Sequence, residues 1–522
     1  MPFKSTQPDI NFPRNGTTWT WLFDSPASLF SQHPTSALAG YTDASTGARV
    51  SYADVKTHTT HLSTALVKKY GLKKGDTVAL FSPNTIWYPV AMLGVSRVGG
   101  VVSGASPAYN VEEMTYALKT AKAKFLFTVE GSMGVAAEAA KAAGIGRERV
   151  FLLQGEMEGF ATMKELLDIG KREREQVSAY RLGKGETNGE LCGFLSFSSG
   201  TTGLPKAVMI SHQNVIAQCL QVQQISPPGR DKVLAVLPSF HITGLVHSLH
   251  LPILLNAEVY MQPAFTMKSM LDTVTRYKID ELLLVPPILI RMVRRITFLL
   301  AHRSGTEGIK NVSRLLRHYP SAPRLRNSPK SLTNLSTGTR SNSRRIRLKL
   351  RHEVQQRRRA AQRRNYDFAT EEIPQYWLQA RVRHDGVMLL HYCSSTRKVR
   401  ELGIGEPGEL LARGPQITMG YLGNEKATKS TYDEEGYLHT GDQAVIDAEG
   451  MVTITDRIKE MIKVKGIAVA PAELEDLLLG HSHVEDCAVL GIRDEYSGEK
   501  PKAFIVKKPG SPAERELGGE LI

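Results

Sequence analysis

The chain lacks several features that would place it in common classes of protein. Its 522 residues include only four cysteines, Cys192, Cys219, Cys393 and Cys487, and no Cys-x-x-Cys pair. This spacing argues against a zinc site or a disulfide framework and favours a reducing compartment. There is no run of about 18 apolar residues, so we expect no membrane-spanning helix.

Targeting signals are also missing from both ends of the sequence. Residues 1–9 have no apolar core of the kind found in secretory signals, and residues 520–522 are not a peroxisomal tripeptide. We therefore expect an intracellular, cytoplasmic protein, with a peroxisomal location left open.

The net charge of +14 arises from one segment. Residues 296–395 contain 20 Lys and Arg residues but only 6 Asp and Glu residues, whereas the rest of the chain is balanced. The segment has few apolar residues and little periodicity, a composition that favours disorder. Nucleic-acid binding is an alternative for so basic a segment, but it lacks interleaved aromatic residues for base stacking. We expect no nucleic-acid partner.

Strand-like and helix-like segments alternate along residues 36–295. This alternation predicts an α/β fold in which helices cover parallel sheets. The expected strands are 77–81, 101–105, 124–129, 150–154, 232–237, 258–261 and 282–285, and the expected helices include 86–98, 111–121 and 133–143.

The pattern changes after residue 400. Residues 409–413, 437–447 and 451–456 alternate apolar and polar side chains, and Glu449-Gly450 predicts a hairpin turn. A small β-rich portion should therefore follow the large α/β domain. A small α+β domain is expected last, with a helix at 471–479 and strands at 486–492 and 502–507.

The most informative motif is the segment Ser196-Phe-Ser-Ser-Gly-Thr-Thr-Gly-Leu-Pro-Lys206. Apolar runs on both sides predict a strand, a polar loop and a second strand. Hydroxyl groups, exposed backbone N–H groups and a lysine suit a polyphosphate, although a turn that binds nothing is the simpler alternative. The motif is not a P-loop, because Ala207 follows the lysine. The candidate phosphate-binding residues are Ser198, Ser199, Gly200, Thr201, Thr202, Gly203 and Lys206.

This motif resembles the phosphate-binding signature of the adenylate-forming superfamily, which includes acyl-CoA synthetases, luciferases and peptide-synthetase adenylation domains. Three more segments agree in order and approximate spacing: Leu237-Pro-Ser-Phe-His-Ile-Thr-Gly244, Gly436-Tyr-Leu-His-Thr-Gly-Asp442, and a segment that begins Asp456-Arg-Ile-Lys-Glu-Met-Ile-Lys463. They are most similar to 4-coumarate–CoA ligases and other aryl or medium-chain acyl-CoA ligases. The resemblance covers roughly residues 20–295 and 400–510.

The resemblance implies a synthetase domain over residues 20–457 and a C-terminal domain over residues 458–522. It also implies an ATP-dependent acid–CoA ligase that uses ATP, Mg²⁺ and coenzyme A. A carboxylate attacks the α-phosphorus of ATP, and the coenzyme A thiolate then displaces AMP. A luciferase-like oxygenase and a peptide-synthetase adenylation domain are alternatives within the superfamily, although no carrier domain follows to support the second.

The resemblance further implies roles for single residues in nucleotide binding. Residues 198–206 would enclose the β- and γ-phosphates of ATP. Asp442 would accept hydrogen bonds from the two ribose hydroxyls, which suits a carboxylate with two oxygens. Arg457 would give a second contact to ribose or phosphate. The structural alternative for Asp442 is a turn residue at a strand end.

Three further residues are candidates for catalysis, and none is assigned to a metal. His241 would lie near the acyl group and the α-phosphate, Lys459 at the hinge between the domains, and Lys463 near the adenylate. The alternatives are a structural histidine at a sheet edge and lysines on a solvated strand face.

Two departures from the family pattern concern catalysis. The family's Thr-Glu motif is not found within residues 296–395, and its C-terminal lysine motif is not found before Ile522. A smaller departure is Ala468, where related ligases often have Gln. Each of the two larger omissions is expected to slow adenylation strongly. A nucleotide-binding homologue with impaired catalysis is therefore an alternative, as is a reading-frame or splice error in the basic segment.

Overall fold

A computed structural model describes most of the chain outside the basic segment. Two units divide the chain, one formed by Met1–Ala264 with Tyr376–Ile522 and the other by Phe265–Gln375. The predictions made for residues 296–386 lie outside the described residues. Those residues are 10–26, 28–198, 205–226, 229, 231–285, 288–289, 292, 387–393, 399–448, 450–458, 462–464, 467–469, 471–481, 483–494 and 498–508.

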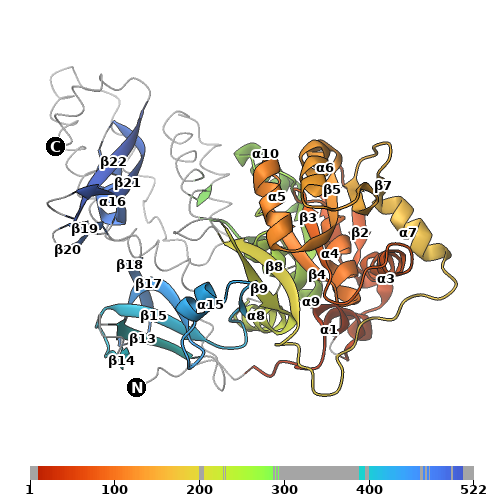
Figure 1. Cartoon of the computed structure of the whole chain (residues 1–522), viewed down its shortest axis with the longest axis horizontal. Helices are drawn as coiled ribbons and strands as arrows, with labels where there is room; N and C mark the ends of the chain where they lie inside the picture. The colour runs from red at the N-terminus through yellow and green to blue at the C-terminus, as the bar shows by residue number, and fades with distance from the viewer. Residues whose placement is uncertain are drawn as a thin grey trace, which may run out of the picture. The chain divides into compact units, whose positions relative to one another are not determined.

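The first unit contains an eight-stranded sheet in the order β16-β9-β8-β4-β3-β5-β6-β7, of which Figure 1 labels β9, β8, β4, β3, β5 and β7. The strands from β8 to β7 are parallel, whereas β9 and β16 are antiparallel to their neighbours. The structure thus has the predicted α/β fold and adds an antiparallel edge. The strands are β3 Thr77–Phe81, β4 Val101–Ala105, β5 Ala123–Val129, β6 Val150–Gln154, β7 Ala161–Thr162, β8 Cys192–Ser198, β9 Lys206–Ser211 and β16 Gly420–Tyr421.

Alternation along β3 accounts for the helices on the two faces of this sheet. Val78 and Leu80 belong to one buried cluster, to which α3 and α4 also contribute, and Ala79 and Phe81 belong to a second cluster with α5 and α6. Successive side chains of a strand point to opposite faces, so a fully apolar strand predicts helices on both. The helices are α3 Tyr52–Lys68, α4 Tyr88–Arg97, α5 Val111–Thr120 and α6 Met133–Ala142.

A second sheet in the same unit places β10, β11, β1 and β2 side by side in that order. The first three are parallel, and β2 is antiparallel to β1. Tyr41 and Val259 from this sheet belong to the same buried cluster as α3 and α4, so one core joins the two sheets. The strands are β1 Gly40–Asp43, β2 Arg49–Ser51, β10 Lys232–Ala235 and β11 Glu258–Met261.

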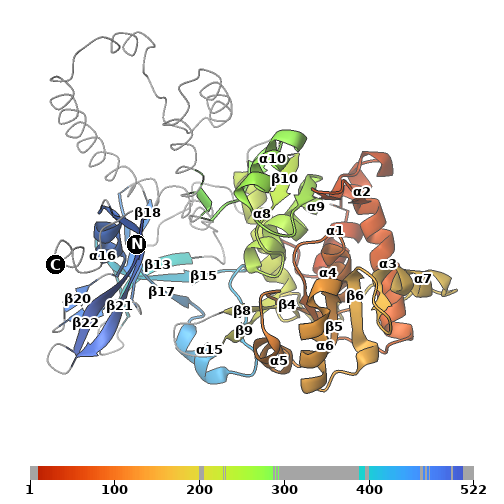
Figure 2. The same ribbon diagram turned by 90° about the horizontal axis from the view of Figure 1, so that it is seen from above.

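A third sheet is antiparallel and corresponds to the predicted β-rich portion, in the order β14-β13-β15-β17-β18. Figure 1 labels all five strands, and Figure 2 shows β13, β15 and β17 from above. Among the side chains that the structure describes, a buried apolar cluster of this sheet contains Leu410, Ala444 and Ile446. The strands are β13 Val387–Cys393, β14 Val399–Glu401, β15 Gly408–Arg413, β17 Leu438–Ile446 and β18 Val452–Arg457.

The expected α+β region at the C-terminal end contains a fourth sheet, in the order β20-β19-β22-β21, with a helix that contacts β21. In the second unit, the strand predicted at 282–285 is found only as the two-residue β12, Glu281–Leu282. The elements are β19 Ile462–Val464, β20 Ile467–Val469, α16 Pro471–Leu479, β21 Val484–Asp494, β22 Gly498–Lys507 and, in the second unit, α10 Met267–Tyr277.

The remaining helices are α1 Thr18–Asp24, α2 Leu29–Gln32, η1 Thr35–Ala37, η2 Glu130–Ser132, η3 Arg147–Arg149, α7 Met163–Arg172, α8 His212–Ile225, the π-helix η4 Gly244–His250, α9 Leu251–Leu255 and α15 Glu425–Thr431. Within the described part of the chain, none of the helices has the length and apolar character needed to cross a membrane.

Candidate functional site

The predicted phosphate-binding motif lies at the carboxyl end of a parallel strand. β8 ends at Ser198 and pairs with β4, which is parallel to it. β9 then begins at Lys206 and returns antiparallel to β8. Ligands of open α/β sheets bind outside the carboxyl ends of the strands. The location of the motif therefore suits a ligand site.

The register of this hairpin places two predicted residues opposite each other. Ser198 is the cross-strand partner of Lys206, so both lie where the loop leaves the sheet. The strand–loop–strand prediction is confirmed for the described part. The predicted residues Ser199, Gly200, Thr201, Thr202 and Gly203 lie outside the described residues, and their contacts stay a prediction.

Two tyrosines that the sequence analysis missed support this hairpin. The Tyr116 hydroxyl, on α5, donates to the Pro205 carbonyl at 2.9 Å. Lys206 Nζ lies 5.4 Å from the ring centroid of Tyr421 on β16, a cation–π contact. Both contacts join residues far apart in sequence, so no local pattern indicates them.

His241 follows β10 in a tightly bonded segment. Its backbone N–H donates to the Pro238 carbonyl at 3.2 Å, and its carbonyl accepts from the Leu245 N–H at 2.9 Å. The ring Nδ1 accepts from the Thr243 N–H at 3.3 Å. Since Nδ1 accepts there, a neutral ring carries its proton on Nε2. Desolvation lowers the pKa of His241 and favours this neutral form.

Asn84, which the sequence analysis also missed, holds the segment that leads to His241. Its side-chain amide donates to the carbonyls of Ala235 and Leu237 at 3.2 and 3.0 Å. Its oxygen accepts from the Ser239 N–H at 2.7 Å. Asn84 comes three residues after the end of β3, so its contacts join the His241 segment to the carboxyl end of that strand.

Close backbone packing brings the same segment to β4. A Cβ atom on Gly104 would lie 2.6 Å from the carbonyl oxygen of Phe240. Gly104 is the penultimate residue of β4, and β4 pairs with β8. The structure thus brings the segment of His241 and the strand that ends at Ser198 to the same edge of the eight-stranded sheet.

Asp442 and Arg457 are cross-strand partners on β17 and β18. The side chain of Arg457 lies outside what the structure describes, so its contacts stay a prediction. Asp442 is partly buried, and its backbone N–H donates to Thr440 Oγ1 at 3.1 Å. It therefore lies within a strand, beside a locally irregular turn, and not at the strand end that the structural alternative assumed.

Two predicted lysines have no described side chain. Lys459 lies outside the described residues, and the backbone of Lys463 pairs with Ala468 between β19 and β20. Their roles, together with a domain boundary at 457, stay predictions. Among the residues that the structure describes, no group of three or more His, Cys, Asp or Glu side chains could hold a metal ion.

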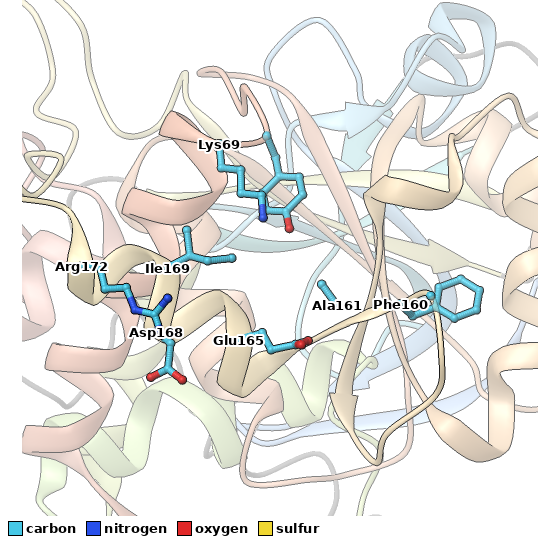
Figure 3. A pocket seen from close by; sticks show the side chains of 9 residues that line it. Lys69, Phe160, Ala161, Glu165, Asp168, Ile169 and Arg172 are labelled. Atoms are coloured by element: carbon cyan, nitrogen blue, oxygen red, sulfur yellow. The ribbon is translucent and has the colours of Figure 1, made fainter.

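A cavity of about 540 Å³ lies away from these residues, beside α7 (Figure 3). Two basic and two acidic side chains line it, and Glu165 among them accepts from the backbone and hydroxyl of Thr162, which lowers its pKa. None of the predicted site residues lines the cavity, so it is not part of the candidate site. The lining residues are Lys69, Tyr70, Gly159, Phe160, Ala161, Glu165, Asp168, Ile169 and Arg172.

Comparison with protein families gives two matches. Residues 30–339 match the AMP-binding enzyme family, and residues 473–522 match the AMP-binding enzyme C-terminal domain. The first match continues past residue 295, where the sequence analysis ended the resemblance, so that limit was set too early.

Relatives and solved structures agree with these matches. The chain is 29% identical to 4-coumarate–CoA ligase 3 of Arabidopsis thaliana, over 100% of the chain and 87% of that protein. It is 30% identical to peroxisomal OPC-8:0-CoA ligase 1 of the same plant, over 92% and 84%. ATP-bound MatB from Rhodopseudomonas palustris has the same fold, with a TM-score of 0.67 and 22% identity over 97% of the chain and 93% of MatB. The o-succinylbenzoate CoA synthetase of Bacillus subtilis, solved with an acyl-adenylate, gives a TM-score of 0.66 and 17% identity over 97% and 91%.

Proposed function

Because the chain belongs to the AMP-binding enzyme family, with acid–CoA ligases among its relatives, we propose that it joins an aromatic or medium-chain carboxylic acid to coenzyme A at the expense of ATP. One observation carries the proposal. The β8–β9 hairpin has Ser198 and Lys206 facing each other where its polar loop leaves the carboxyl end of a parallel strand.

In the first step, a carboxylate oxygen of the acid attacks the α-phosphorus of ATP. The bond from that phosphorus to the bridging oxygen breaks, and pyrophosphate leaves with the electron pair. Negative charge grows on pyrophosphate as it leaves, so a cation at the loop lowers the barrier. Lys206 is the described residue suited to this role, and its contact with Tyr421 limits the positions of its side chain.

His241 supplies a neutral donor in this scheme. With Nδ1 occupied by the Thr243 N–H, the ring offers Nε2–H to the carboxylate or to an oxygen of the α-phosphate. A neutral imidazole donates without attracting the carboxylate into an unproductive ion pair. The lowered pKa keeps the ring in this form at neutral pH.

In the second step, the thiolate of coenzyme A attacks the acyl carbon. The bond from that carbon to the AMP oxygen breaks, and AMP leaves. Asp442 and Arg457 bind the nucleotide in both steps, through the ribose hydroxyls and a ribose or phosphate oxygen. We assign Lys459 to the hinge that separates the steps and Lys463 to the adenylate. Mg²⁺, when bound with ATP, neutralises part of the phosphate charge.

The test is the chain itself, incubated with ATP, Mg²⁺, coenzyme A and a panel of aromatic and medium-chain acids. We expect acid-dependent release of pyrophosphate and an acyl-CoA thioester of the expected mass. Pyrophosphate without thioester would indicate an enzyme that only adenylates. A specific observation favours one second candidate: the Thr-Glu motif of the family was not found in residues 296–395. Nucleotide binding without pyrophosphate release would support that candidate, a homologue with impaired catalysis.

A further inference from the structure

Two irregularities of the third sheet lie close to Gly441-Asp442 in β17. The pairing of β15 with β17 shifts register between Glu409 and Leu411, and the pairing of β17 with β18 shifts between Gln443 and Ala444. Gly441 adopts a φ of +75°, a left-handed conformation that favours glycine. Such bulges re-aim a side chain and are typical of functional positions.

Side chains bind the backbone amides at this turn. The Gly441 N–H donates to Glu409 Oε1 at 3.2 Å, and the Asp442 N–H donates to Thr440 Oγ1 at 3.1 Å. The Thr440 hydroxyl in turn donates to the Leu410 carbonyl at 2.7 Å. Both contacts lead back to neighbouring residues of β15. The conformation just before Asp442 therefore depends on Glu409 and on Thr440.

The second oxygen of Glu409 is also engaged. His439 Nδ1 lies 3.0 Å from Glu409 Oε2, and since an ionised carboxylate only accepts, His439 donates. His439 Nε2 is 3.8 Å from Asp433 Oδ2, and Asp433 Oδ1 accepts the N–H groups of Glu435 and Tyr437. Glu409 is thus held in one orientation by a chain of polar contacts along the third sheet.

We propose that Glu409 is a positioning residue for nucleotide binding, which acts by fixing the Gly441 peptide so that the Asp442 carboxylate meets both hydroxyls of a ribose. The proposal rests on the proposed function, because it assumes that Asp442 binds ribose. If Glu409 only stabilised the sheet, its loss would weaken the binding of ATP and of 2′-deoxy-ATP equally. A positioning role makes a narrower claim: loss of Glu409 weakens the recognition of the hydroxyls in particular.

Glu409→Ala and Glu409→Gln form the test pair, because glutamine keeps an oxygen for the Gly441 N–H. The matched control is Glu258→Ala on β11. The Glu258 side chain is 16% exposed, as is that of Glu409, and it contacts Arg49 and Thr42 in the second sheet. Affinities for ATP and for 2′-deoxy-ATP are measured by equilibrium titration, and the unfolding midpoint of each variant is recorded.

We expect Glu409→Ala to weaken ATP about tenfold, the loss of roughly one charge-assisted hydrogen bond, and to change 2′-deoxy-ATP much less. The preference for ATP is the dissociation constant of 2′-deoxy-ATP divided by that of ATP. We expect this ratio to fall toward one in Glu409→Ala, to recover in part in Glu409→Gln and to keep its wild-type value in Glu258→Ala. A Glu409→Ala protein that binds ATP with the wild-type preference would overturn the inference alone. Wild-type protein that binds ATP without any preference would overturn the ribose role of Asp442 and the inference together. Wild-type protein that binds no ATP would overturn the proposed function as well.

Discussion

The eight-stranded sheet and the third sheet are stabilised in different ways. Every residue of β3 is buried, and alternate side chains pack into two separate apolar clusters. In β17, by contrast, only Ala444 and Ile446 are buried, and side chains bind the backbone at Gly441 and Asp442. The eight-stranded sheet is thus a scaffold with a large apolar core, whereas side chains that bind the backbone help to fix the turn of β17 in the third sheet.

This difference between the two sheets indicates which residues determine the stability of the protein and which determine ligand recognition. Burial of apolar surface is non-directional and tolerates small shifts, whereas a hydrogen bond to a charged group fixes one geometry. We therefore expect changes in the scaffold to alter mainly the free energy of unfolding. Changes at the hairpin and at Gly441-Asp442 should alter mainly ligand affinity and rate.

Acid should destabilise the scaffold most. His212 and His250 are buried with ring centroids 5.7 and 5.3 Å from that of Phe194, and burial lowers their pKa values to about 3 and about 4. The unfolded chain protonates both below about pH 6.5, so stability that is present above this pH is lost as pH falls toward 4. From pH 6.5 to 4.5 the loss reaches about 5 kcal/mol, at roughly 1.4 kcal/mol per unit for each ring.

Urea unfolding at several pH values measures this loss. Glu165 and Glu186 also have lowered pKa values, but their contribution to stability is lost below about pH 4.5, outside this window. The variant His250→Gln should remove its own share, about 2 kcal/mol, and leave the shares of the other histidines whose pKa values desolvation lowers, His58, His61, His212 and His241. An unchanged pH dependence in that variant would contradict the assignment.

Truncation of a buried aromatic side chain should have the next largest effect on the free energy of unfolding. Phe151 is fully buried, with ring centroids of Tyr70 and Phe127 each 4.9 Å away. Phe151→Ala should lower the free energy of unfolding by about 3–5 kcal/mol. The control Phe504→Ala, on a ring that is 50% exposed, should cost less than about 1 kcal/mol. Equal costs for the two changes would show that the scaffold is not the source of stability.

Removal of the hairpin cation should act on rate instead. Lys206→Ala is expected to slow acid-dependent pyrophosphate release about 10²–10³-fold, the usual effect of losing one group that stabilises transition-state charge. The unfolding midpoint should barely change. Lys429→Ala, on an exposed lysine of α15 that pairs with Glu425, is the control and should leave the rate unaltered. Similar rates for both variants would remove Lys206 from the mechanism.

A smaller effect is expected from Gly104→Ala, which should change both the free energy of unfolding and the rate of pyrophosphate release. Gly104→Ala places a Cβ against the Phe240 backbone, which should cost about 1–3 kcal/mol and displace the segment of His241. Gly134→Ala in α6 has open space around its Cβ and should be slightly stabilising. Pyrophosphate release by the two folded variants should therefore differ. Equal release would mean that close packing at β4 does not position His241.

The sequence predicts the regular apolar elements of the fold better than it predicts the polar contacts between distant residues. Apolar runs predict β3, β4 and β11 to the residue, and helical spacing does the same for α16, because burial imposes a local period. The β16 edge and the contacts of Asn84, Tyr116 and Glu409 were not predicted. Each joins residues that are distant in sequence, and a single polar residue carries no period that would indicate its partner.

The candidate site divides in the same way. The β8–β9 hairpin and the segments of His241 and Asp442 stand out as motifs, since each concentrates unusual residue types. The irregular pairing that places Asp442 opposite Arg457 was not predicted, because strand register depends on the neighbouring strands.

The most direct test of the proposed chemistry is the exchange of labelled pyrophosphate into ATP, which reports reversible formation of an acyl-adenylate. We expect exchange by the wild-type chain only when a suitable carboxylic acid is present, and strong loss of exchange in Lys206→Ala and Asp442→Asn. Exchange that proceeds without any acid, or no exchange with any acid of the panel by a protein that binds ATP, would contradict the assignment as an acid–CoA ligase.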